Sequence, residues 1–218
     1  MKVAVDIVIF TIQGGVLKVL LVKRRIPPFK GQFAIPGGFV LDNEDLDQAA
    51  LRELQEETGV HDVYLEQLYS FGDPKRDPRA RVISVGYFAL ISADRPLSAG
   101  SDAEEANWYP IAELPTLAFD HAAILEYAMK RLRNKLEYTT VGFQLLPEKF
   151  TLTDLQIVYE TILDKKLDKR NFRRKMAQLK ILKPLKEYHH GGQRPAQLFR
   201  FIATRFEKLK DKGILFPF

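Results

Sequence analysis

The segment GFVLDNEDLDQAALRELQEETGV, residues 38–60, is the most informative part of the sequence for the fold of the first part of the chain. Its centre, Leu46 to Thr58, combines good helix formers with apolar residues at helical spacing, which predicts a helix. Gly59 follows at the position where a left-handed residue commonly ends a helix. Candidate N-caps stand before the segment at Asp42, Asn43 and Asp45. The stretch therefore predicts a loop that leads into one well-delimited helix.

Three glutamates crowd one stripe of this predicted helix. At about 100° per residue, Glu53, Glu56 and Glu57 fall within an arc of about 100°. Such crowding is unfavourable unless a positive charge compensates it, and carboxylate oxygens suit a hard cation such as Mg²⁺ or Mn²⁺. Such an ion can bridge phosphate oxygens and acidify a bound water. Arg52, next to the cluster, is placed to orient one carboxylate through a bidentate pair.

An isolated fragment of this kind is also typical of an acidic, solvent-exposed helix, but the complete spacing is more specific. The order Gly38, Glu44, Arg52-Glu53-Leu54, Glu56-Glu57 and Gly59-Val60 resembles the whole signature of the Nudix family. The resemblance implies an α/β/α sandwich around a mixed sheet over residues 1–140. It also implies that Glu53, Glu56 and Glu57 bind the metal and activate water, with Glu44 and Arg52 in supporting positions. Family substrates are nucleoside diphosphates linked to another group, such as ADP-ribose.

The flanking sequence supplies strands and a basic loop. Val3 to Phe10 and Leu17 to Val22 are apolar and β-branched, and Gln13-Gly14-Gly15 between them predicts a hairpin. Two further strand-like segments, 63–71 and 82–91, enclose a polar loop. Guanidinium groups suit phosphate geometry, so this loop and the signature glycine offer candidate ligand-binding residues: Arg76, Arg79, Arg81 and Gly38. A solvated turn is an equally good interpretation of the loop.

A helix is expected from Asp120, as a cap, to about Glu137. Residues 138–148, with Pro147, then separate two domains at 1–140 and 148–218. The charge changes sign between them. Residues 1–147 hold 16 basic and 20 acidic side chains, a net charge of −4, whereas residues 148–218 hold 17 and 8, a net charge of +9. A basic segment attracts polyanions such as nucleic acid, although a solvated lysine-rich surface has the same composition.

The basic part also has a recognisable order of elements. Thr151 or Thr153 can cap a helix, a turn follows at 164–167, and Asp168 can cap a second helix to about Lys180. Two strands, 181–188 and 197–202, enclose a polar tip. This order predicts a winged helix-turn-helix, and its candidate DNA-binding residues are Lys169, Arg170, Arg173, Arg174, Lys175, Gln193 and Arg194. The alternative for the arginines is a solvated helix face.

The two modules together resemble the Nudix-related transcriptional regulators. The resemblance also covers the runs 71–74, 77–79, 117–121 and 167–175. It implies a dimeric bacterial repressor of NAD-metabolism or sugar-utilisation genes, with ADP-ribose or a related nucleotide or sugar as effector and a palindromic operator. Some members of this family keep hydrolase activity. A second hypothesis is therefore an active Mg²⁺-dependent pyrophosphohydrolase acting on ADP-ribose-like compounds.

The overall composition agrees with an α+β protein of two domains. The 218 residues are 46% hydrophobic and 28% charged, which excludes a collagen-like or disordered chain. The absence of cysteine excludes disulfides and thiolate zinc sites. The sequence has neither a signal-peptide pattern nor an apolar run of about 18 residues, so a soluble, cytoplasmic protein is expected.

Overall fold

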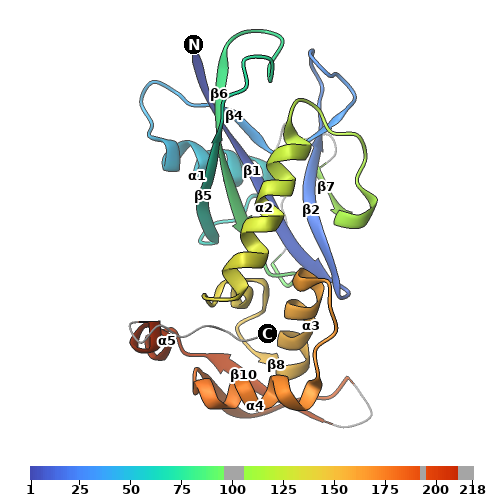
Figure 1. The fold of residues 1–218 in the computed structure, drawn as a ribbon, viewed down its shortest axis with the longest axis vertical. Coiled ribbons are helices and arrows are strands. Elements are labelled where there is room, and N and C mark those ends of the chain that lie inside the picture. Colours follow the sequence, from blue (N-terminus) through green and yellow to red (C-terminus); the bar gives the residue numbers. More distant parts are fainter. Residues whose placement is uncertain (96–105, 192–194, 211–218) are drawn as a thin grey trace. The chain divides into compact units, whose positions relative to one another are not determined.

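The computed structural model describes residues 1–95, 106–191 and 195–210, with side chains through residue 207. The chain divides into two compact units, Met1–Arg131 and Leu132–Phe218 (Figure 1). The division falls inside a helix, so the domain ranges 1–140 and 148–218 stay a prediction. In the part of the chain that the structure describes, every helix is too short or too polar to cross a membrane.

A mixed sheet forms the centre of the first unit. Strand β1 is parallel to β6 and antiparallel to β2, and the main order is β3-β2-β1-β6-β5, with β4 beside β1 and β7 beside β2. Its strands are β1 (Lys2–Gln13), β2 (Val16–Lys23), β3 (Phe33–Ala34), β4 (Gly37–Phe39), β5 (Tyr64–Phe71), β6 (Val82–Leu90) and β7 (Ala106–Pro110). The hairpin of β1 and β2 turns at Gly14 and Gly15, whose φ values of 59° and 76° are those of a turn that favours glycine.

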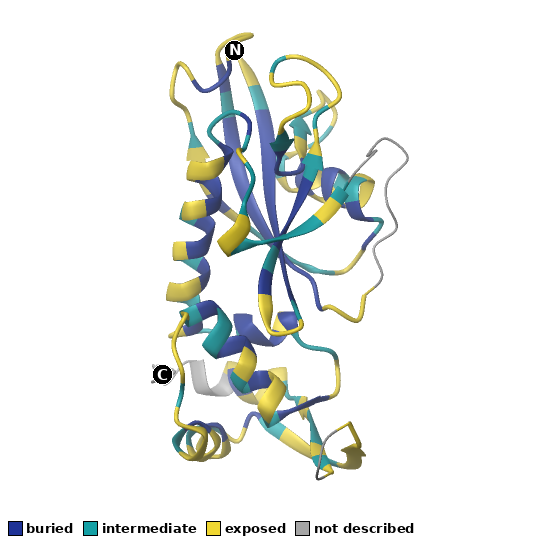
Figure 2. Cartoon of the chain, turned by 90° about the vertical axis from the view of Figure 1, so that its right-hand side faces the viewer, coloured by how far each residue is buried: buried dark blue, intermediate teal, exposed yellow. Residues whose placement is uncertain are grey.

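Two helices cover opposite faces of this sheet, α1 (Leu46–Thr58) and α2 (His121–Leu136) (Figures 1 and 2). A short 3-10 helix, η1 (Ile111–Glu113), follows β7. The alternating side chains of β1 explain the two layers, because Val5, Ile7 and Ile9 pack with Ala49, Ala50 and Leu54 of α1. The predicted α/β/α sandwich with a mixed sheet is confirmed.

The capping residues of α1 are those the sequence suggests. Of the three candidates, Asp45 is the N-cap and forms a capping box with Gln48. Gly59 ends the helix in the left-handed conformation, at a φ of 64°. The acidic stripe therefore starts from a fixed helix end.

The second unit contains the predicted winged helix-turn-helix. Its elements are η2 (Val141–Leu145), β8 (Phe150–Thr151), α3 (Leu152–Leu163), α4 (Lys169–Leu179), β9 (Leu182–His189), β10 (Ala196–Phe201) and α5 (Ala203–Lys210). Thr151 caps α3 through a box with Asp154, and Asp168 caps α4 by accepting from the Asn171 N–H. The strands pair in the order β8-β10-β9, so β9 and β10 form the wing beside the two helices.

The structure adds elements that the sequence pattern did not indicate. Strands β3, β4 and β7 are short and lie in segments expected to be loops or left unassigned, and they are held by pairing with β1 and β2. Helix α5 is a further addition. The carboxylate of Asp120, expected to cap α2, accepts two hydrogen bonds from Arg76.

Candidate functional site

Arg52 is the centre of the acidic cluster on α1. Its guanidinium makes a bidentate pair with Glu44, which lies outside the predicted stripe, with Nε at 3.0 Å and Nη2 at 2.7 Å from the two carboxylate oxygens. Its Nη1 lies 2.7 Å from Glu53 Oε1 and 3.1 Å from Glu56 Oε2. The hydrogen bonds from Arg52 lower the pKa of Glu44, and those to Glu44 raise the pKa of Arg52. One guanidinium thus compensates three of the four signature carboxylates.

Gly38 makes room for one of these carboxylates. A Cβ atom at position 38 would overlap Glu53 Oε1, so a side chain there would displace the carboxylate. Glu53 is only 8% exposed, and burial raises its pKa while the bond from Arg52 lowers it. The signature glycine and glutamate are therefore packed against each other.

The donor types on α1 fit a hard divalent cation, since all of them are carboxylate oxygens. The carboxylates are not arranged around a common cation position, because Arg52 Nη1 bonds to both Glu53 and Glu56. Among the described residues, no three carboxylate, imidazole or thiol side chains are grouped so that they could hold one ion. Arg52 supplies the compensating charge in this arrangement.

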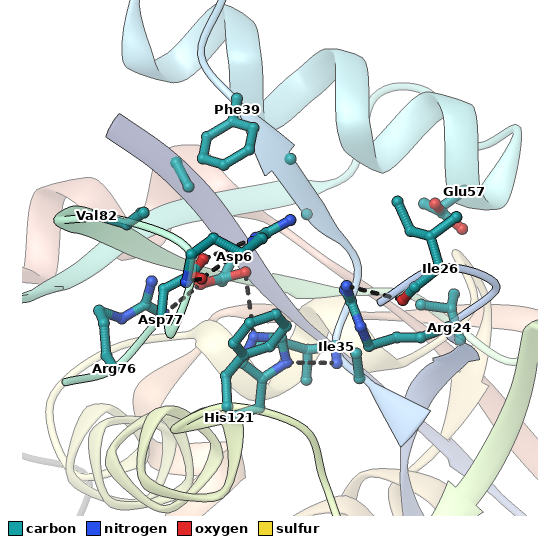
Figure 3. Close-up of a pocket in the computed structure, with 17 residues that line it drawn as sticks. Asp6, Arg24, Ile26, Ile35, Phe39, Glu57, Arg76, Asp77, Val82 and His121 are labelled. Atoms are coloured by element: carbon teal, nitrogen blue, oxygen red, sulfur yellow. Dashed lines mark hydrogen bonds and ion pairs between the residues drawn. The ribbon is translucent and has the colours of Figure 1, made fainter. Parts of the chain in front are cut away.

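A cavity of about 320 Å³ opens between β1, the loop that follows β2, and the start of α2 (Figure 3). Of the predicted site residues it brings together Gly38, Glu57, Arg76 and Arg79. Arg81 is not in the described lining, and its Nη1 donates to the Gly72 carbonyl at 2.6 Å. The remaining lining residues are Ala4, Asp6, Val22, Arg24, Ile26, Ala34, Ile35, Gly37, Phe39, Asp77, Val82, Phe119 and His121.

Arg76 holds the inner wall of this cavity together. The side chain is buried, and it donates to Asp6 Oδ2 at 3.0 Å and to both carboxylate oxygens of Asp120 at 2.8 and 2.9 Å. Ser84 donates to the same oxygen of Asp6. A guanidinium with these partners is a brace between β1 and the start of α2.

His121 completes this wall in its neutral form. Its Nδ1 accepts from the Ile35 N–H at 3.1 Å, and its Nε2 faces Asp6 Oδ1 at 3.5 Å (Figure 3). Burial lowers the pKa of His121. The proton therefore resides on Nε2, and the imidazole acts as a fixed polar group of the wall.

The lining residues that sequence reasoning did not predict include the polar and aromatic side chains of Asp6, Arg24, Phe119 and His121. Asp6 had a usable signal, because it is the one charged residue in the apolar run from Val3 to Phe10. A buried strand tolerates a carboxylate only when the fold supplies a partner. Arg24 lies in a loop without a comparable signal. Phe119 and His121 lie in the run 117–121, which carries part of the family resemblance, but nothing in the local pattern marked them as pocket residues.

The outer face of α4 presents a different kind of site. Phe172 and Met176 are buried, whereas Lys169, Arg170, Arg173 and Arg174 are exposed and Lys175 is partly buried. Arg174 donates to Asn171 Oδ1 at 2.8 Å and Arg173 to Thr153 Oγ1 at 3.5 Å. In the described ranges, no carboxylate forms an ion pair with Arg170, Arg173 or Arg174. The predicted wing-tip residues Gln193 and Arg194 lie outside the described residues.

Two family models match the chain. The NUDIX domain model matches residues 1–132, and the model of the NrtR DNA-binding winged helix domain matches residues 142–201. A curated relative, the ADPR responsive transcriptional repressor NtrR of Acinetobacter baylyi, is 40% identical over 217 residues, which is 98% of this chain and 84% of the relative.

Solved structures show similarity over both units. The crystal structure of Shewanella oneidensis NrtR complexed with a 27mer DNA has a TM-score of 0.84 and 37% identity, covering 94% of this chain and 95% of that chain. The NUDIX domain of the same protein complexed with ADP ribose has a TM-score of 0.56 and 39% identity, covering 61% of this chain and 88% of that chain.

Proposed function

The chain belongs to the NrtR family of Nudix-domain transcriptional regulators, and we propose that it is a repressor that responds to ADP-ribose. The Nudix domain, residues 1–140, binds the effector, and the winged helix domain, residues 148–218, binds operator DNA. One observation carries the proposal: a winged helix-turn-helix shares a chain with a Nudix pocket, and the exposed arginines on its α4 form no ion pair with a described carboxylate.

The contacts with DNA follow from the charge on α4. In a winged helix-turn-helix the second helix enters the major groove, and arginine donates to guanine or to phosphate oxygens. Lys169, Arg170, Arg173, Arg174 and Lys175 supply these donors, and Gln193 and Arg194 supply the wing contacts. A homodimer would place two such helices on the half-sites of a palindromic operator.

The effector controls DNA binding only if it binds the two states of the protein with different affinity. A tenfold change in operator affinity requires about 1.4 kcal/mol of coupling between the sites. ADP-ribose is the favoured effector because similar proteins are named for responding to it or are solved with it. Such a repressor acts in the cytoplasm, where the chromosome is.

The second candidate function is hydrolysis, and the complete set of signature glutamates favours it. Nudix proteins in general use divalent metal ions, and Glu53, Glu56 and Glu57 would hold Mg²⁺ or Mn²⁺ here. A bound ion supplies charge to phosphate oxygens and acidifies water. Because Arg52 engages Glu53 and Glu56, these carboxylates would first have to leave the guanidinium.

The two functions are separated by two assays on the full chain. A gel shift with the DNA upstream of the protein's own gene, with and without ADP-ribose or pentoses, tests the repressor. We expect a shifted band that ADP-ribose changes. Release of phosphate products from ADP-ribose with Mg²⁺, compared in Glu56→Gln and Glu57→Gln, tests the hydrolase. Activity that disappears in both variants, together with no operator shift, would identify an enzyme.

A further inference from the structure

A second hollow of the first unit lies between β5, the loop that follows it and the start of α2, and we call it the aromatic groove. Its volume is about 690 Å³. Among the described residues, only Arg76 and Phe119 line both this groove and the Nudix cavity of Figure 3. Four aromatic side chains line the groove: Tyr69 and Phe71 of β5, Phe29 of the loop after β2, and Phe119 just before α2.

A β-bulge turns the aromatic side chains of β5 toward α2. The pairing of β5 with β6 shifts register between Gln67 and Tyr69. Before the shift, Glu66 faces α2, because its carboxylate pairs with Arg131 at 3.6 Å. Residues three positions apart on a regular strand point to opposite faces, so without the bulge Tyr69 would point away from α2. With the bulge, the Tyr69 ring stacks on Tyr127 of α2, with centroids 5.1 Å apart and planes at 25°.

Folding leaves two rings of the groove in contact with solvent, although neighbours hold both in place. Tyr69 is 54% exposed, and Phe71 meets it edge to face at 5.6 Å. Phe29 is 36% exposed and has a φ of 61°, and its ring meets that of Phe119, which has a φ of 53°, at 4.8 Å. A bulky residue at positive φ is costly, and such residues cluster at ligand sites. Burial within the chain recovers little of this cost for Phe29.

The charged groups of the groove balance each other. Arg76 and Asp120 are paired through hydrogen bonds of 2.8 and 2.9 Å. Asp73 and Lys75 add one exposed charge of each sign, and no carboxylate in the described part of the chain forms an ion pair with Lys75. A groove of this charge does not select a phosphate. It suits a flat, neutral ring with both donors and acceptors on its edge, because a carboxylate accepts hydrogen bonds and an ammonium group donates them.

We propose that the aromatic groove binds a purine nucleoside, as a second site separate from the Nudix cavity. A purine presents flat faces to the aromatic side chains, and every base can stack on such rings through its π face. Its edge offers donors to Asp73 and acceptors to Lys75. This site does not depend on the identity of the effector.

Calorimetric titration of the full chain with adenosine, with and without saturating ADP-ribose, tests the groove. We expect adenosine to bind in both conditions, and ribose, which lacks the base, not to bind. Tyr69→Leu, which keeps an apolar side chain but no aromatic ring, should weaken adenosine binding by roughly fivefold or more. Tyr69→Phe keeps the ring and should bind as the wild type does. The matched control is Tyr138→Leu, which removes an exposed tyrosine outside the groove lining and should also bind as the wild type does.

Thermal unfolding of each variant checks that the fold is retained. If Tyr69→Leu does not fold, Lys75→Ala at an exposed position takes its place. It removes a donor and should weaken adenosine binding by about twofold or more. Unchanged binding in Lys75→Ala would then overturn the site.

The outcomes separate this site from the proposed function. Adenosine binding that disappears in saturating ADP-ribose would place the nucleoside in the Nudix cavity and overturn the second site, as would equal losses in Tyr69→Leu and Tyr138→Leu. A change of oligomeric state in Tyr69→Leu on size-exclusion chromatography would identify the groove as a subunit contact and also overturn it. Adenosine binding that depends on Tyr69, in a protein that does not bind ADP-ribose, would support the groove and reject the effector. A protein that binds neither compound would overturn both.

Discussion

The arginines of the two units have opposite surroundings. Arg76 in the first unit is 8% exposed and bonds to Asp6 and Asp120. Arg170 and Arg174 on α4 are exposed, and no described carboxylate forms an ion pair with them. From the sequence, both groups were candidate anion-binding residues, because both consist of arginines. Burial and nearby carboxylates decide whether such a charge is used inside the fold or left for a ligand.

The first prediction concerns the buried arginine, Arg76. Arg76→Ala leaves Asp6 and Asp120 without their cation, and removing one partner of a buried ion pair costs about 3–5 kcal/mol. The free energy of unfolding of the first unit should fall by this amount. Trp108, the only tryptophan of the chain, lies on β7 and reports on this unit by fluorescence during urea unfolding.

Arg170→Ala is the matched control for that experiment. It removes an exposed arginine and should change the same free energy by less than about 0.5 kcal/mol. A loss below about 1 kcal/mol in Arg76→Ala would show that Arg76 is no brace, and its charge would then be available to a ligand, as the sequence suggested.

The second prediction concerns the exposed arginines of α4. The triple variant Arg170→Ala, Arg173→Ala, Arg174→Ala should lose roughly 100-fold or more in operator affinity. The slope of log affinity against log salt should become shallower by about 3, if each arginine contacts a phosphate. Fluorescence anisotropy with labelled operator at several salt concentrations measures both quantities.

Stability and effector binding should not change in the triple variant, because these side chains pack against little of their own unit. Lys30→Ala is its control and removes one exposed cation from the first unit. Operator affinity that falls equally in Lys30→Ala would indicate a general charge effect and would count against α4 as the reader of DNA.

The same contrast explains what the sequence could predict. The caps of α1, α3 and α4, and the glycine turn of the β1–β2 hairpin, depend on residues within a few positions of each other, so local pattern reduces them to one, two or three candidates. The wall of the cavity depends on distant partners: Arg76 meets Asp120 44 residues away and Asp6 70 residues away, and His121 meets Ile35 86 residues away. Only the fold brings such residues together.

Exposed residues that have no distant partner can, by contrast, be placed from the local sequence pattern. The arginine face of α4 could be derived from helical spacing, because exposed residues need no distant partner. The position of Arg24 could not be derived, because its guanidinium lies over the ring of Phe119, which is 95 positions further along the chain. The sequence shows where the arginines are, but it does not show which of them are neutralised by carboxylates from distant parts of the chain.

The third and smallest prediction compares acidic residues of the two units by pH. Burial raises the pKa of Glu53, so the native state holds this proton more tightly than the unfolded state. The stability that Glu53 contributes is present at low pH and is lost as pH rises through the native pKa. Glu160 in the second unit is the reverse case. Hydrogen bonds from the Leu167 N–H and from Gln156 lower its pKa, so its contribution is present above the ordinary pKa and is lost as pH falls.

Glu53→Gln and Glu160→Gln should therefore change the pH dependence of stability with opposite sign. Above the ordinary pKa of glutamate, Glu53→Gln should reduce the decline that accompanies rising pH, whereas below that pKa Glu160→Gln should reduce the loss on acidification. Trp108 fluorescence follows the first variant and far-ultraviolet circular dichroism the second. Changes of the same sign in both variants would mean that burial does not govern Glu53, and that its bond to Arg52 outweighs the loss of solvent. The cluster on α1 would then resemble an exposed salt bridge more than a buried site, and the contrast between the two units would apply to Arg76 but not to the carboxylates.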